Sequence, residues 1–150
     1  PGESAPVVPE ETLKEDLVIF DTAETFTTAG YDTKLVFDSD IDLTGYKYIK
    51  VELSSENAAG NKVAVQFMDS AYAKCGLVES TALDSNVVTL YSDCGTNFWE
   101  DTNYDGTGDK QSTVTVLKQV QIYAQQTVSP WGTVDGVEVT IDKITLTNTK

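Results

Sequence analysis

The stretch Leu117-Lys-Gln-Val-Gln-Ile-Tyr-Ala-Gln125 decides the fold of this chain. Its apolar members alternate with polar ones, a period of two that predicts a β-strand with one face in a core. The outward set is Gln119, Gln121, Tyr123 and Gln125. These are neutral hydrogen-bonding amides and an aromatic ring, which suit a polyol such as a sugar better than a charged ligand. The alternative is an ordinary uncharged surface facing solvent.

The composition narrows the classes of partner. The 150 residues fit one domain, and ten Lys with no Arg stand against 24 Asp plus Glu, a net charge of −14. Nucleic acid and an anionic membrane surface are excluded because both need clustered cations. Acidic polysaccharides are disfavoured because Arg, which grips carboxylates with two hydrogen bonds, is absent. Without His or Arg, carboxylate pairs are the main acid–base chemistry that remains.

The N-terminal residues and the two cysteines say less about the fold and the function. Residues 1–11 (PGESAPVVPEE) read as a linker tail, so we expect a domain linked to a larger enzyme or surface protein. The domain then spans residues 12–150. No run reaches the roughly 18 apolar residues of a membrane span. Cys75 and Cys94 permit a disulfide, but in a simple hairpin Cys75 would face Leu90, so a bridge needs a bulge or strands in different sheets.

Seven or eight short alternating strands follow one another along the chain. They are expected at 17–20, 34–37, 46–53, 62–69, 72–79, 86–91, 116–125 and 136–148, with an acidic turn at 38–45 and a polar loop at 92–111. No helical period is convincing. This pattern predicts an all-β, antiparallel β-sandwich, here a jelly roll in a single domain. Gln66 would share the outward set of the central stretch if strands 62–69 and 116–125 belong to one sheet.

The order of several segments is familiar. Together LVIFDTAETF, GYKYIKVELS, KVAVQFMDS, LKQVQIYAQ and VEVTIDKITLTN resemble the jelly-roll carbohydrate-binding modules of bacterial glycoside hydrolases that degrade plant polysaccharides. The resemblance covers about residues 15–148 as a pattern, without one diagnostic motif. It implies that sheet residues bond sugar hydroxyls and that loop aromatics stack on pyranose rings. The sheet candidates are Gln66, Gln121, Tyr123 and Gln125, and the loop candidates are Trp99, Tyr104 and Trp131.

Two calcium sites are expected. Residues 101–109 match the opening of an oxygen-rich calcium loop, with Asp101, Asn103, Asp105 and Asp109 at ligand positions, although Ser112 stands where a bidentate Glu is needed. The alternative is a solvated acidic turn, because Asp, Asn and Gly favour turns as well. The resemblance implies a second, structural site at Asp21, Glu24 and Asp142.

Three functions fit the sequence. The leading one is non-catalytic binding of a neutral polysaccharide such as β-glucan, xyloglucan, mannan or xylan by a monomeric, secreted or cell-surface module. The second is a structural or protein-interaction sandwich of a surface protein. The third is a glycoside hydrolase with two carboxylates, which is disfavoured because the predicted face offers Gln where Glu is needed. We therefore expect no enzyme activity.

Overall fold

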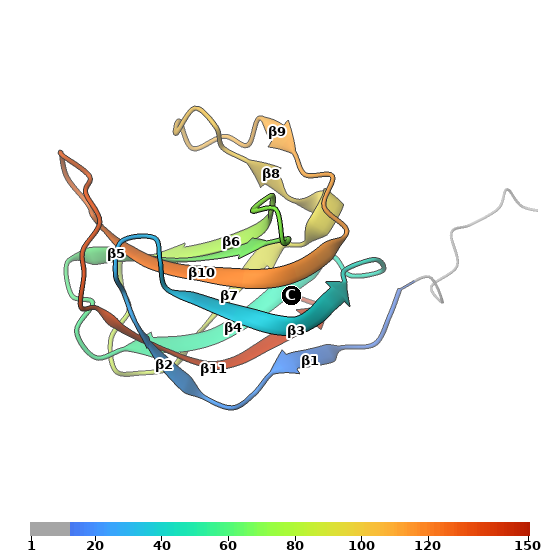
Figure 1. Cartoon of the computed structure of the whole chain (residues 1–150), viewed down its shortest axis with the longest axis horizontal. Coiled ribbons are helices and arrows are strands. Elements are labelled where there is room, and N and C mark those ends of the chain that lie inside the picture. Colours follow the sequence, from blue (N-terminus) through green and yellow to red (C-terminus); the bar gives the residue numbers. More distant parts are fainter. Residues whose placement is uncertain (1–12) are drawn as a thin grey trace, which may run out of the picture.

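The computed structural model describes residues 13–150 as one β-sandwich of two antiparallel sheets (Figure 1). The tail predicted for residues 1–11 lies outside this range. The first sheet, sheet A, contains β1 (Leu17–Phe20), β2 (Glu24–Thr27), β4 (Tyr48–Ser55), β7 (Val88–Asp93) and β11 (Glu138–Thr147). Sheet B contains β3 (Lys34–Asp42), β5 (Asn61–Met68), β6 (Lys74–Ser80) and β10 (Val116–Gln126). A small hairpin of β8 (Trp99–Glu100) and β9 (Lys110–Gln111) follows a short 3-10 turn, η2 (Gly95–Asn97).

The order of strands confirms the predicted antiparallel sandwich. Sheet A runs β1-β11-β4-β7, with β2 also pairing β11, and sheet B runs β3-β10-β5-β6. Consecutive strands mostly alternate between the sheets, which is the jelly-roll arrangement. The inner faces meet in one core of Ile, Val, Leu and Phe side chains. Among residues 13–150, no helix is long and apolar enough to cross a membrane.

The central stretch folds as its period predicts. It forms β10, whose inward Val120, Ile122 and Ala124 are fully buried. β10 lies between β3 and β5 and pairs with β5 from Gln119 opposite Met68 to Gln126 opposite Asn61. Strands 62–69 and 116–125 therefore share a sheet, as the sequence interpretation required.

Some boundaries differ from the prediction. Residues 38–42, expected in an acidic turn, continue β3, because at the edge of a sheet Asp side chains stay in water. The short β2 was not predicted, and the polar loop at 92–111 contains the β8–β9 hairpin. β6 begins at Lys74, two residues later than expected.

The two cysteines are free and buried. They do not belong to one hairpin, because β6 and β7 lie in different sheets. The sheets approach closely here, since the Leu77 amide donates to Ser92 Oγ at 2.9 Å. Burial raises the pKa of both thiols, that of Cys94 to about 12, so neither is a reactive thiolate at neutral pH.

Candidate functional site

The outer face of sheet B carries the residues singled out in the sequence. Gln121 lies directly opposite Lys34 on β3 and Gln66 on β5, and Gln66 lies opposite Leu77 on β6. Their side chains share the outer face because each neighbour along β10 points into the core. The next row contains Tyr123, with Ala64 and Glu79.

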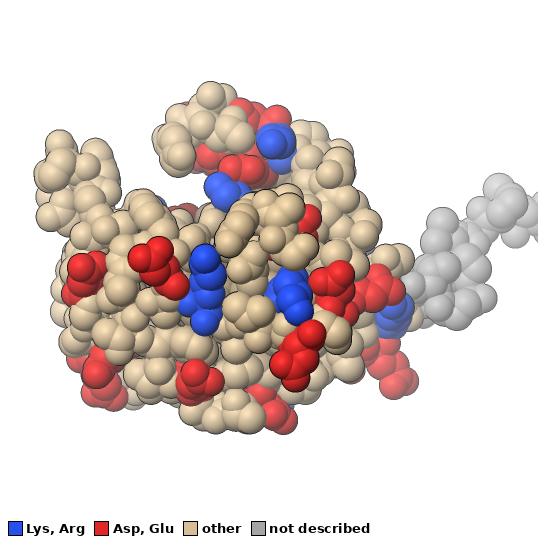
Figure 2. Space-filling model, in the orientation of Figure 1, with Lys and Arg blue, Asp and Glu red and all other residues tan. Residues whose placement is uncertain are grey.

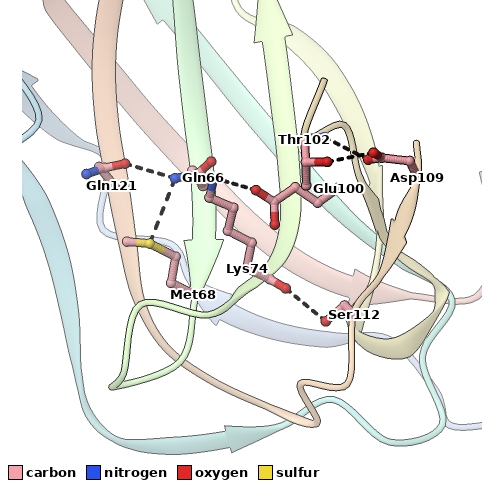
Figure 3. Close-up of polar contacts among 8 residues, drawn as sticks. All are labelled: Gln66, Met68, Lys74, Glu100, Thr102, Asp109, Ser112 and Gln121. Carbon is pink, nitrogen blue, oxygen red and sulfur yellow. Dashed lines mark hydrogen bonds and ion pairs between the residues drawn. The ribbon is translucent and has the colours of Figure 1, made fainter. Parts of the chain in front are cut away.

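The amides of this face are bonded to one another and to a loop. Gln66 Nε2 donates to Gln121 Oε1 at 3.0 Å (Figure 3), and Gln121 Nε2 donates to the Tyr31 carbonyl at 2.9 Å. Gln125 Nε2 donates to the Tyr31 hydroxyl at 3.0 Å. Gln121 thus uses both ends of its amide within the protein. Its role is to fix Tyr31 and Gln66, whereas the carbonyl oxygens of Gln66 and Gln125 accept no hydrogen bond from residues 13–150.

Two tyrosines form the aromatic centre of the face. The rings of Tyr31 and Tyr123 meet edge to face, with centroids 5.0 Å apart at 63°. Burial raises the pKa of the Tyr123 hydroxyl to about 12, and Glu79, Tyr31 and Tyr104 add to this rise. Tyr104 belongs to the loop that joins β8 to β9.

The β8–β9 hairpin is fixed to sheet B by two contacts, and a third holds the hairpin itself together. Lys74 Nζ pairs with Glu100 Oε2 at 2.8 Å, and Ser112 Oγ donates to the Lys74 carbonyl at 2.8 Å (Figure 3). Gly108 lies so close to Trp99 that an added Cβ would stand 2.6 Å from the Trp99 Cβ. The hairpin thereby holds half-exposed Trp99 and the loop with Tyr104 beside the face.

Exposed aromatic rings surround this face. They are Tyr31 (49% exposed), Tyr72 (58%), Trp99 (51%), Tyr104 (91%) and Trp131 (61%), and no other aromatic side chain of residues 13–150 is as exposed. They come from the loops and the hairpin that border sheet B. In Figure 2 the hairpin and the β10–β11 loop rise as two lobes with an open hollow between them. The face therefore has an aromatic rim.

Three rim residues have an unfavourable backbone. Tyr72, Tyr104 and Trp131 adopt φ values of 67°, 57° and 63°, and Ala23 is the only other non-glycine residue among residues 13–150 with positive φ. The left-handed region costs a bulky side chain roughly 1–2 kcal/mol. Each of these exposed rings thus belongs to a residue whose backbone conformation is unfavourable.

The sequence identified three rings of this rim, Trp99, Tyr104 and Trp131, and part of the face that the rim surrounds. It predicted Gln66, Gln121, Tyr123 and Gln125 on one face, and the structure brings them together there. It missed Tyr31 and Tyr72. The segments AGYDT and DSAYAK carry turn residues beside a tyrosine, and that was the available signal.

The carboxylates of the expected calcium loop bond to the loop itself. Asp101 accepts the amides of Asp105 and Gly106, whereas Asp109 accepts the Thr102 amide and hydroxyl at 2.8 and 2.6 Å (Figure 3) and the Asn103 side chain. The Thr102 bonds lower the pKa of Asp109.

The second expected calcium set is not gathered either. Glu24 pairs with Ile141 at the edge of sheet A, and Asp142 occupies an irregularity of β11. Within residues 13–150, no three acidic, His or Cys side chains are grouped to hold a metal ion. Calcium at either set stays a prediction that draws no support from this geometry.

No protein-family model matches the chain, and no curated protein matches it.

Proposed function

We propose that the outer face of sheet B binds a chain of a neutral polysaccharide without catalysis. The observation that carries this proposal is the aromatic rim. Three of its rings are exposed and belong to residues with a left-handed backbone. Both features are unfavourable for the free protein, and contact with a ligand would explain them. A pyranose offers apolar C–H faces to such rings and hydroxyls to amide oxygens.

The polar groups support a neutral ligand. The central rows offer the carbonyl oxygen of Gln125, and that of Gln66, whose side chain is largely buried, as acceptors for hydroxyls. The acid of the Tyr123 row is neutralised, because Glu79 pairs with Lys62 at 2.9 Å. Glu100 likewise pairs with Lys74, so neither carboxylate resembles one member of a glycosidase pair.

The hollow favours one chain over a flat crystalline surface. The two lobes rise on either side of it, so a planar array of chains would meet the lobes before it reached the bottom of the hollow (Figure 2). Such a module, secreted or on a bacterial cell surface, would direct an attached enzyme to its substrate.

Affinity electrophoresis with soluble β-glucan, xyloglucan, mannan and xylan tests the proposal. The wild type should be retarded by at least one glycan, and Trp131→Ala should lose most of this retardation. Tyr91→Ala is the matched control, because Tyr91 lies in β7 of sheet A opposite Lys50, on the other side of the molecule. Equal retardation of both variants, or none of the wild type on the panel, would refute the proposal. An overnight reducing-sugar assay should stay negative.

A further inference from the structure

A pocket lies beside the proposed glycan face. It has a volume of about 330 Å³, and its walls include Tyr72, Lys74, Glu100, Lys110 and Ser112. The β5–β6 loop forms one wall and the β8–β9 hairpin another. This volume is at the small end of the roughly 300–1,000 Å³ typical of ligand pockets, which suits a single sugar unit.

Cations gather around this pocket, although the protein is strongly acidic. Lys74 and Lys110 line it, and Lys34 Nζ lies 4.9 Å from the centroid of the Tyr72 ring. Lys74 is paired with Glu100, whereas Lys110 makes no ion pair with residues 13–150. Asp69, in the adjoining β5–β6 loop, accepts the amides of its own turn. Two ammonium groups and one carboxylate therefore line the pocket, in a chain of net charge −14.

The pocket is positioned to receive a branch from a chain on the face. Lys34 lies opposite Gln121 across the β3–β10 pair, and Lys74 lies opposite Met68 on β5. Both lysines thus belong to rows that continue the glycan face. Tyr72 offers an exposed ring on a left-handed backbone, the same combination that marks Tyr104 and Trp131.

We propose that this pocket binds a uronic acid side group of an otherwise neutral polysaccharide. The carboxylate would meet Lys110 and the Lys74–Glu100 pair, and the sugar ring would lie against Tyr72. This inference rests on the proposed function for its biological context, but the pocket can be tested separately. A Lys ammonium group contacts a carboxylate as a single charge, whereas Arg would form two parallel hydrogen bonds with it. We therefore expect only modest selectivity for the charged sugar.

NMR titration of the ¹⁵N-labelled protein with methyl glucuronide and methyl glucoside is the direct test. The backbone amides of Ser112 and Val114 report on the pocket, away from Tyr123. The glucuronide should shift these signals with roughly fivefold higher affinity than the glucoside, a gain that about 0.5 M salt should abolish. Lys110→Gln should remove the preference, whereas Lys50→Gln on sheet A, an equal charge change, should keep it.

The outcomes separate the two proposals. Equal shifts by both sugars, no shifts at all, or a preference that survives Lys110→Gln would overturn the uronic acid pocket, even if neutral glycans are retarded in gels. Loss of the gel retardation in the Trp131 test concerns only the neutral-chain face. The methyl ester of the glucuronide, which is uncharged and nearly the same shape, should behave like the glucoside.

Discussion

Replacing Tyr104 by Asn measures separately how much this ring lowers the stability of the fold and how much it contributes to glycan binding. Tyr104 is 91% exposed, so its removal loses almost no packing, and its φ of 57° suits Asn far better than Tyr. We expect Tyr104→Asn to stabilise the fold by about 0.5–1 kcal/mol, which raises Tm by roughly 1–4 °C for a chain of this size. Loss of one stacked ring should meanwhile weaken glycan binding by about fivefold, or ~1 kcal/mol.

Differential scanning calorimetry and titration calorimetry measure these two effects on the same samples. Tyr104→Phe keeps the ring and the backbone conformation and should match the wild type in both assays. If Tyr104→Asn lowers Tm by several degrees, the ring supports the fold and is not merely displayed. Binding within twofold of the wild type would remove Tyr104 from the ligand site.

Four further predictions test other parts of the structure. Gly76→Ala should cost about 1–3 kcal/mol in urea unfolding, because its Cβ would lie 2.8 Å from Ile49 Cδ1; an unchanged midpoint would contradict this close contact between the sheets. The pKa of Tyr123 is raised to about 12 from an ordinary 10, so the folded state holds this proton longer than the unfolded state does. The free energy of unfolding should therefore fall between pH 10 and 12, and Tyr123→Phe should flatten that slope in urea titrations. Cys75 and Cys94 should react with a thiol reagent only after denaturation, and fast labelling of the native protein would show that they are accessible. If loop 101–109 binds calcium, Tm should be several degrees higher in calcium than in EDTA, and an equal Tm would refute that site.

The sequence predicted the strands whose two faces differ clearly. β4 and β10 alternate between buried and half-exposed residues over most of their length, β5 and β11 alternate in sequence although Val63–Met68 and Ile144–Thr147 are buried throughout, and all four appeared close to their expected places. The period fails where both sides are wet or polar. β3 continues through 38–42 as an edge strand with exposed Asp residues, and that composition is also typical of a turn. β2 has only four residues, too few to show a period.

The candidate site was predictable along one strand but not across the fold. The parity of β10 placed Gln121, Tyr123 and Gln125 on one face, and the match with Gln66 required only that β5 be its neighbour. Tyr31 reaches Tyr123 from a segment 92 positions earlier in the chain, through contacts that no local pattern encodes. The hydrogen bond from the Gln121 amide to the Tyr31 carbonyl likewise depends on tertiary structure. Gln121, which was expected to contact the ligand, therefore holds Tyr31 in place instead.

The other outer face of the same molecule serves as an internal comparison. Both faces meet the same solvent on the same fold, so polarity alone predicts that they should look alike. Sheet A presents Lys50 opposite Tyr91 and Lys143 opposite Glu52, the mixture of charges expected of an ordinary solvated sheet. The exposed rings all border sheet B instead, and three of them add the cost of a left-handed backbone. Solubility and stability both oppose that asymmetry, and this supports the proposal that the rings contact a ligand.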